Sequence, residues 1–321
     1  MGERDNSGAS YLHLAGVVII VVVSGTRHMT SIVGARHLAA TTIPNSGVTR
    51  PPPGTPSSYS HGALIGGAYR VVTVLGCGGM SVVVAATRLA DEMPVAVKFA
   101  AVAEAPLEMV LRGAISNEAA VLRRISSAGV PPLLDYGEDE TVGPFLVLPL
   151  LRGATVADLV CDAPYGAAEA LVLVEDILTV LCDVHRAGVI HGDIKPTNIW
   201  VGARSPGSVT LIDYGLATHP AVRLTRDVCR IAGTPGYIAP ERKYGREDPR
   251  SDLFAVAATI LAAMDAECFD ELCNSALSAG LWLESRGFSA ASAALIAYAL
   301  EANPNDRPTS AAAMLRELRA Q

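Results

Sequence analysis

The chain has 321 residues, half of them hydrophobic, and a formal net charge of −7. This length and apolar content allow one large domain or two medium ones, each with a sizeable core. An acidic chain without a basic run is poorly suited to the phosphate backbone of nucleic acid, so we expect no nucleic-acid partner.

Six cysteines are spread along the chain without a CxxC pair or a nearby histidine at zinc spacing. We therefore expect reduced thiols in a cytoplasmic protein. The cysteines are Cys77, Cys161, Cys182, Cys229, Cys268 and Cys273.

Residues 1–65 lack the pattern of a folded domain. The apolar run Leu14–Val23 is shorter than the roughly 20 residues of a membrane span. The residues Glu3, Arg4 and Asp5 do not give the net positive start of a signal peptide. Three interpretations stay open: a membrane or export segment, a buried or loosely attached strand, or an extension without set structure.

A stretch rich in Pro, Ser, Thr and Gly, residues 44–60, predicts a linker. We therefore expect residues 1–65 to be a largely disordered extension and residues 66–321 to form the folded domain. Attachment to a membrane through residues 14–23 is the alternative to a cytoplasmic location.

From residue 66 the pattern becomes β-rich and then helical. Three apolar segments in close succession, Tyr69–Leu75, Val82–Thr87 and Pro94–Ala100, predict an antiparallel sheet. A helix over 107–126 and a strand at Phe145–Leu150 follow. The later helical patterns are Ala167–Ala187, Asp252–Met264 and Ala290–Leu300. The order predicts an α+β fold with a small β-rich part and a larger helical part.

The glycine-rich turn at residues 76–81 joins the first two predicted strands. Glycines allow the backbone to approach phosphate oxygens and to aim N–H groups at them. By itself such a turn is more often only a hairpin. Lys98 on the next strand favours a nucleotide site, because its ammonium suits a phosphate.

The segment His191–Asn198 carries the most specific signal. It places the carboxylate of Asp193, the ammonium of Lys195 and the amide of Asn198 within eight residues, and Asp213 follows twenty residues after Asp193. Each residue alone fits a turn-capping role. Together they supply what a phosphoryl transferase needs to orient a hydroxyl, meet the moving phosphate and hold Mg²⁺.

Lysine usage supports this interpretation. The chain has three lysines against 22 arginines, and two of the three, Lys98 and Lys195, fall at these motif positions. Arginine cannot replace a compact ammonium there, because its planar fork has a different reach.

These motifs resemble those of the eukaryotic-like (Hanks-type) serine/threonine protein kinases. The Gly78-Gly79-Met80 turn looks especially like that of bacterial members. The resemblance covers residues 66–321 and implies a bilobal fold, ATP and Mg²⁺ as cofactors, and proteins bearing Ser or Thr as substrates.

The resemblance also implies the nucleotide contacts. Glu118 is the expected partner of Lys98; a solvated Glu118, or Glu108 in its place, is the alternative. Leu148 is the expected gatekeeper, and Leu151 the hinge residue whose backbone meets adenine. The full expected set is Leu75, Gly76, Cys77, Gly78, Gly79, Val83, Ala96, Lys98, Glu118, Leu148 and Leu151.

The implied catalytic residues are Asp193, Lys195 and Thr234. Asp193 would accept the proton of the substrate hydroxyl, Lys195 would stabilise the γ-phosphate, and Thr234 would contact both. The implied metal ligands are Asn198 and Asp213. Tyr214 stands where the family usually has Phe, and we expect the ring packing to be kept.

Three further residues are expected to support the fold around the site. Glu241 and Arg307 would form a buried ion pair, and Asp252 would bind backbone N–H groups of the catalytic loop, residues 191–198.

Gly192 is the main departure from the family, which usually has arginine there to bind a phosphorylated activation-loop residue. We therefore expect activity that does not depend on such phosphorylation, although Thr218 and Thr225 are candidate autophosphorylation sites.

Two alternatives to an active protein kinase stay open. Ser81 at the third glycine position and Gly192 favour a nucleotide-binding pseudokinase scaffold. A small-molecule kinase of related shape is the other, although the Thr234-Pro235 and Ala239-Pro240-Glu241 elements are more typical of protein kinases.

Overall fold

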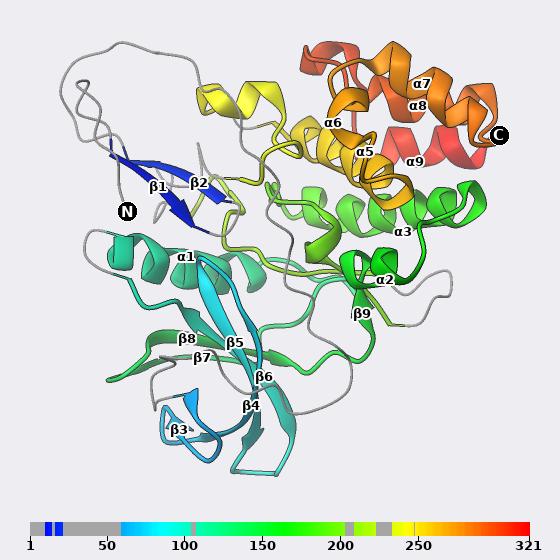
Figure 1. Ribbon diagram of the computed structural model, residues 1–321. Coiled ribbons are helices and arrows are strands. Elements are labelled where there is room, and N and C mark those ends of the chain that lie inside the picture. Colours follow the sequence, from blue (N-terminus) through cyan, green and yellow to red (C-terminus); the bar gives the residue numbers. More distant parts are fainter. Residues whose placement is uncertain are drawn as a thin grey trace.

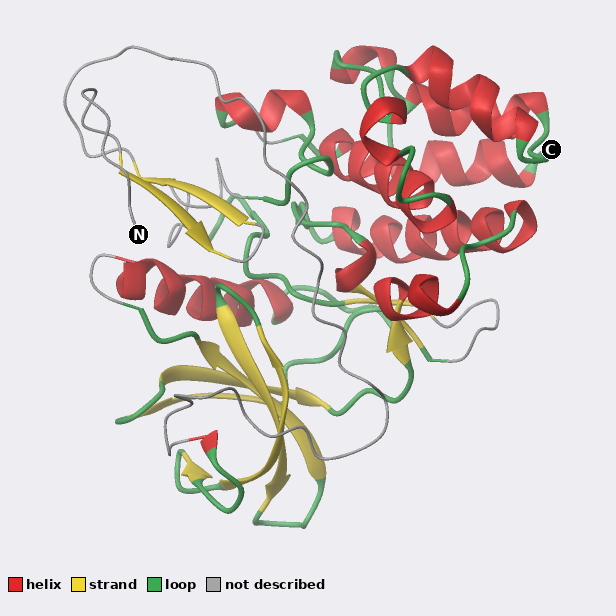
Figure 2. Ribbon diagram, viewed as in Figure 1, coloured by secondary structure: helices red, strands yellow, loops and turns green. Residues whose placement is uncertain are grey.

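The described part of the chain forms two lobes, a small one built on a sheet and a larger helical one (Figures 1 and 2). The computed structural model describes residues 59–103, 107–202, 209–222, 233–246 and 248–321, and the backbone of two strands nearer the amino terminus. The predicted bilobal α+β fold is confirmed.

The small lobe contains a six-stranded antiparallel sheet with the order β3-β4-β5-β6-β8-β7. The strands predicted from alternating apolar residues are present, each within about two residues of its expected ends. Its members are β3 (Leu64–Ile65), β4 (Tyr69–Cys77), β5 (Ser81–Arg88), β6 (Pro94–Ala100), β7 (Asp135–Asp139) and β8 (Gly143–Pro149).

The edge strand β7 was not expected from the sequence. Its residues, Asp-Tyr-Gly-Glu-Asp, are polar and show no apolar alternation. It forms a strand because it pairs along its whole length with the apolar strand β8, which is a long-range interaction.

The small lobe begins before the predicted boundary at residue 66. Tyr59 is buried, and its ring centroid lies 5.1 Å from that of Phe99 in β6. Ile65 is also buried in this core. The predicted boundary therefore falls inside the packed lobe.

Within the amino-terminal extension, β1 (Ser10–Leu14) and β2 (Val17–Val21) pair in antiparallel. Of the three interpretations of this segment, the hairpin agrees with the one that expected a strand. The rest of residues 1–58 lies outside the described residues. No helix in the described ranges is long and apolar enough to cross a membrane.

Helix α1 (Leu107–Leu122) packs beside the sheet through Leu111 and Ile115, which form a cluster with Leu146 of β8. The helix ends four residues before its predicted end. Glu118 is also buried in α1, and Figure 1 shows α1 on the side of the sheet that faces the helical lobe.

The helical lobe is organised around α5 (Arg250–Met264), in which every residue from Ser251 onward is buried. The helix is apolar or small on all sides, the pattern of a helix enclosed in a core. The other helices are α2 (Val156–Asp162), α3 (Ala167–Arg186), α6 (Phe269–Leu272), α7 (Ala276–Ser285), α8 (Ala290–Tyr298) and α9 (Ala311–Arg319), with 3-10 turns η2 (Pro196–Asn198), η3 (Pro240–Tyr244) and η4 (Pro304–Asp306).

A three-stranded sheet in the order β11-β10-β9 places the site loops next to each other. It contains β9 (Ala154–Thr155), β10 (Ile199–Val201) and β11 (Val209–Leu211). Because β10 directly follows Asn198 and β11 ends two residues before Asp213, their antiparallel pairing brings those two residues to the same end of the sheet.

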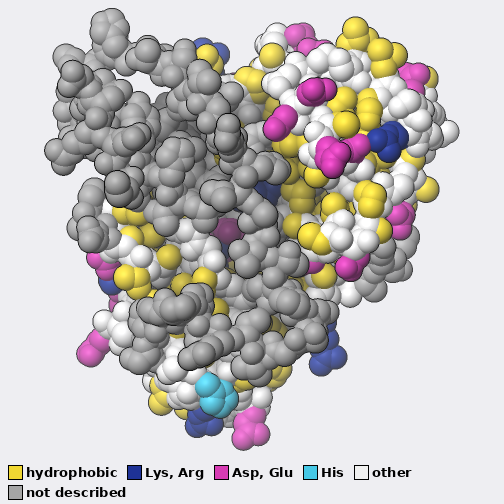
Figure 3. All heavy atoms as spheres, in the orientation of Figure 1, with side chains coloured by type: hydrophobic (Ala, Val, Ile, Leu, Met, Phe, Trp, Pro, Cys, Tyr) yellow, Lys and Arg dark blue, Asp and Glu magenta, His cyan; other side chains and the backbone are white. Residues whose placement is uncertain are grey.

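Surface and thiol chemistry agree with the composition. Acidic side chains are spread over the visible face of the helical lobe (Figure 3). Cys77, Cys161, Cys182, Cys268 and Cys273 are free thiols, as expected, and Cys229 lies outside the described residues.

The expected pair of Glu241 and Arg307 is present and buried. Arg307 donates from Nη1 and Nη2 to the two carboxylate oxygens of Glu241, at 2.8 and 2.7 Å, and the side chains are 0% and 5% exposed. Ser251 of α5 also donates to Glu241, at 2.5 Å. The pair therefore ties η3 to α5 and to the segment before α9.

We predict that Arg307→Met lowers the free energy of unfolding by about 3–5 kcal/mol, because it leaves the Glu241 carboxylate buried without its cation. Urea unfolding measures this. The matched control is Arg186→Ala, which breaks the exposed pair with Asp183 and should cost less than about 1 kcal/mol. Equally small losses of unfolding free energy in both variants would show that the buried pair does not stabilise the fold.

Candidate active site

Lys98 lies at the centre of the site. Its side chain on β6 is buried, and its Nζ lies 2.6 Å from Oε2 of Glu118 and 2.9 Å from Oδ1 of Asp213. The expected contact with Glu118 is confirmed. Glu108 instead pairs with Arg112 one turn along the exposed surface of α1, so neither alternative to Glu118 holds.

The two carboxylates keep Lys98 charged. Burial by itself lowers the pKa of an ammonium, but the charges of Asp213 and Glu118 outweigh it and raise the pKa of Lys98. Burial likewise raises the pKa of Asp213, but the Lys98 charge more than offsets this and lowers it to about 2. The Lys98–Asp213 contact is therefore an ion pair at neutral pH.

Asp213 has a backbone conformation that is unfavourable for a residue other than glycine. Its φ of 66° lies in the left-handed region, which costs a non-glycine residue of order 1 kcal/mol. Its side chain remains 42% exposed although Oδ1 contacts Lys98. The exposed part of the carboxylate therefore leaves room for a further ligand.

The expected catalytic residues form one hydrogen-bonded cluster. Oδ2 of Asp193 accepts from Nζ of Lys195 at 2.8 Å and from Nδ2 of Asn198 at 3.0 Å. The Thr234 hydroxyl donates to Oδ1 of Asp193 at 3.1 Å and accepts from Lys195 at 2.6 Å. The contacts expected for Thr234 are thus present.

Asp252 binds the backbone of the catalytic loop, as expected. Its carboxylate accepts from the backbone N–H groups of His191 and Gly192, both at 2.9 Å. Burial raises the pKa of Asp252, but the His185 ring at 2.9 Å and these bonds lower it overall. The loop is therefore anchored to the buried helix α5 by a charged acceptor.

Four of the expected nucleotide residues, Val83, Ala96, Lys98 and Leu148, share one face of the small-lobe sheet. Strand register pairs Val83 with Lys98, and Ala96 with Leu148. Directly paired residues, and residues two apart on one strand, point to the same face. Leu148 also packs against the cores of both lobes, so this face meets the helical lobe at Leu148.

The glycine loop is open. A Cβ at Gly76 would meet nothing within 4 Å, and one at Gly78 would meet only the Ser81 carbonyl oxygen at 3.8 Å. Neither has a left-handed φ. These two glycines are therefore not required by packing or by backbone conformation. Cys77 between them is exposed, and so is Leu75, which precedes Gly76 in β4.

Three residues in or beside the site were missed by the sequence analysis. His185 contacts Asp252, and Asn117 contacts the segment after Asp213. Arg242 lies against Gly192. The spacing of Asn117 from Ala114 and Val121, three and four residues, puts it on the buried face of α1 and could have marked it.

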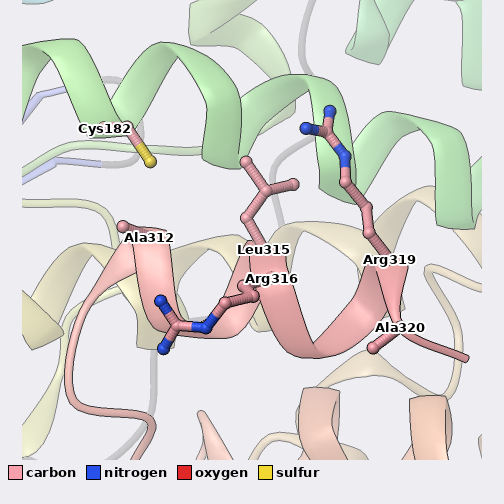
Figure 4. Close-up of a pocket in the computed structure, with 6 residues that line it drawn as sticks. All are labelled: Cys182, Ala312, Leu315, Arg316, Arg319 and Ala320. Carbon is pink, nitrogen blue, oxygen red and sulfur yellow. The ribbon is translucent and has the colours of Figure 1, made fainter.

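A pocket elsewhere, between α3 and α9, contains none of the expected site residues (Figure 4). It is lined by Cys182, Ala312, Leu315, Arg316, Arg319 and Ala320.

Tyr214 keeps the ring packing expected for Phe but adds a buried hydroxyl. The ring is fully buried with its centroid 4.6 Å from that of His191. Its hydroxyl has no hydrogen-bond partner within the described part of the chain. An unpaired buried hydroxyl costs roughly 1–3 kcal/mol of stability.

We predict that Tyr214→Phe raises the free energy of unfolding by about 1 kcal/mol, since it removes the unpaired group and keeps the ring. Urea unfolding measures this. Tyr136→Phe is the control: its hydroxyl lies 2.9 Å from Oγ of Ser116, so its loss should be destabilising. A less stable Tyr214→Phe protein would mean that the hydroxyl has a partner.

Comparison with known proteins agrees with this geometry. The profile of the protein kinase domain matches residues 69–318. The chain is 31% identical over 279 residues to serine/threonine-protein kinase pkn3 of Myxococcus xanthus, which is 81% of this chain and 51% of that protein. It is 30% identical over 270 residues to serine/threonine-protein kinase PknL of Mycobacterium tuberculosis, covering 80% and 66%.

A third relative is the DNA damage-responsive serine/threonine-protein kinase RqkA of Deinococcus radiodurans, 33% identical over 207 residues, with 62% and 30% covered. The chain thus spans about half to two thirds of the length of pkn3 and PknL, and less of RqkA. The matched profile covers most of the chain and includes every residue of the cluster around Lys98 and Asp193. The chain therefore belongs to the protein kinase family, among the bacterial serine/threonine kinases.

Proposed function

We propose that the chain transfers the γ-phosphoryl group of ATP to serine or threonine hydroxyls of protein substrates, assisted by Mg²⁺. The observation that carries this proposal is the double ion pair of Lys98 with Glu118 and Asp213. It joins the sheet, α1 and the helical lobe at the place where the phosphates of a nucleotide would lie.

The sheet face supports nucleotide binding. Val83, Ala96 and Leu148 present apolar side chains on the face that carries Lys98, as a flat adenine ring requires. The space around Gly76 and Gly78 leaves room for phosphate oxygens to approach the backbone of the glycine loop. Leu75 precedes this loop, Cys77 lies within it, and Leu151 follows β8 at the proposed hinge.

Asn198 and Asp213 fit a magnesium site. The Asn198 amide nitrogen donates to the Asp193 carbonyl oxygen at 2.8 Å, so its own oxygen is directed away from that group. With the half-exposed carboxylate of Asp213, this gives the oxygen donors that Mg²⁺ prefers. When bound, Mg²⁺ neutralises phosphate charge.

The Asp193 cluster supports the transfer step. Asp193 would accept the hydrogen bond, and then the proton, of the incoming hydroxyl. Lys195 lies between Asp193 and Thr234 and would stabilise the negative charge of the transferred group. Thr234 would fix the position of both residues relative to the substrate.

The two alternatives make different demands. A pseudokinase scaffold would bind nucleotide without turnover, and the intact Asp193 cluster argues against it. A small-molecule kinase would not act on generic protein substrates. Incubation of the purified chain with labelled ATP, Mg²⁺ and a protein substrate separates all three.

We predict that Asp193→Asn lowers kcat about 10²–10⁴-fold with little effect on unfolding, because the general base is lost. Asp213→Ala should also lose the Mg²⁺ dependence of nucleotide binding. Transfer to a protein substrate and calorimetry with ATP measure these effects. Asp183→Asn, at an exposed pair with Arg186, is the control and should be unchanged. Near-parental activity of Asp193→Asn would overturn the role given to Asp193.

We further propose that activity does not require phosphorylation of the activation segment, residues 213–241. Gly192 has a φ of 79°, and a Cβ there would lie 2.9 Å from Cζ of the buried Arg242. Arg242, directly after the segment, thus fills the space beside Gly192, the position where the family usually has its own arginine.

The candidate phosphorylation sites differ in their surroundings. Thr218 is buried, and its backbone N–H and carbonyl both pair with Ile190, at 2.9 and 3.0 Å. A phosphate at Thr218 would break this packing, which argues against that candidate. Thr225 lies outside the described residues.

We predict that phosphatase treatment leaves kcat/KM within about threefold, which corresponds to roughly 0.7 kcal/mol of transition-state stabilisation. Thr225→Ala should behave in the same way, whereas Thr234→Ala should lose most activity because Thr234 contacts Asp193 and Lys195. A hundredfold loss on dephosphorylation, restored by rephosphorylation, would contradict this proposal.

A further inference from the structure

Asn117 is a buried polar residue to which neither the comparisons nor the family motifs assign a role. It lies in α1 directly before Glu118 and is 2% exposed. Its Nδ2 donates to the backbone carbonyl oxygen of Ala217 at 2.9 Å and to that of Gly215 at 3.3 Å. Both acceptors lie about a hundred residues further along the chain, at the start of the activation segment.

These two bonds use the whole donor capacity of the amide. A primary amide has two N–H donors, and a buried one that loses its partners costs stability. The carbonyl groups of Gly215 and Ala217 belong to no strand or helix. One position of α1 therefore allows both sets of contacts: Glu118 reaches Lys98, and the Asn117 amide reaches the carbonyl groups of residues 215 and 217.

Neighbouring atoms of α1 hold neighbouring parts of the segment. Oε1 of Glu118 accepts from the backbone N–H of Tyr214 at 3.2 Å, while its Oε2 contacts Lys98. Asn117 then binds the next carbonyl groups, at 215 and 217. Beyond them, Thr218 pairs with Ile190, the residue before the catalytic loop. Backbone from Tyr214 to Thr218 is thus held between α1 and the catalytic loop.

We propose that Asn117 is a positioning residue that locks α1 to the start of the activation segment and so keeps Asp213 within reach of Lys98. The proposal rests on the function proposed above for this site. An outward movement of α1 would break the Glu118 contacts and both hydrogen bonds of the Asn117 amide together. Because Asn117 is uncharged and built into the helix, this lock needs no phosphate.

The test is Asn117→Leu, which has a similar size but no donor. We expect kcat/KM for a protein substrate to fall about tenfold to hundredfold, the effect of losing two buried hydrogen bonds. Asn117→Gln keeps the two donors on a longer chain and should recover part of the loss. Ser116→Ala is the matched control, because Ser116 is the adjacent residue and contacts Arg112 and Tyr136 instead. It should stay within about twofold of the parent.

Amide hydrogen exchange separates positioning from general stability. In Asn117→Leu we expect exchange at residues 214–218 to accelerate at least about tenfold while the buried helix α5 keeps its protection. Acceleration throughout the protein, or a folded Asn117→Leu protein with parental kcat/KM and parental exchange at 214–218, would overturn the proposal. Exchange does not require turnover. A parent chain inactive on proteins would therefore refute the proposed function, and the exchange comparison would still decide the role of Asn117.

Discussion

The rest of the site depends on one buried ammonium. Lys98 comes from the sheet, Glu118 from α1 and Asp213 from the helical lobe. The Lys98 ammonium lies 2.6 Å from the Glu118 carboxylate and 2.9 Å from that of Asp213. A cation buried at this depth is tolerable only when its counter-charges are present, because an unpaired buried charge costs several kcal/mol. The ion pairs therefore couple the two lobes: the arrangement that satisfies Lys98 is also the one that aligns the proposed nucleotide face with the proposed metal ligands.

A rigid base in the helical lobe makes this coupling useful. The buried helix α5 supplies Asp252, which holds the backbone of the catalytic loop, and Ser251, which contacts the Glu241–Arg307 pair. Two sides of the site are thus tied to one enclosed helix. Against this base, Asn117 and Glu118 hold the start of the activation segment from the other side. The proposed catalytic groups are positioned by contacts within the chain, as preorganised catalysis requires.

The sequence predicted the elements whose information is local, and the resemblance to protein kinases supplied long-range contacts such as Lys98–Glu118 and Glu241–Arg307. Alternating apolar residues and helical periodicity located β4, β5, β6, α3 and α5, and motif spacing located Lys98, Asp193 and Asp213. The strand β7 could not be predicted, because only pairing with β8 makes its polar residues a strand. The contacts of Asn117 and Arg242 were equally out of reach, since each joins segments far apart in the chain. Tyr214 was expected to pack like Phe, but the lack of a partner for its hydroxyl among the described residues is visible only once its surroundings are known.

The central claim, that Lys98 and Glu118 act as one unit in binding nucleotide, is tested most directly by a double-mutant cycle. The affinity for ATP in the presence of Mg²⁺ is measured by calorimetry for the parent, Lys98→Met, Glu118→Gln and the double variant. If the pair acts as a unit, each single change weakens binding about tenfold or more, and the double change weakens it no further than about threefold beyond the worse single change. Effects of the two single changes that simply multiply in the double variant would contradict the account.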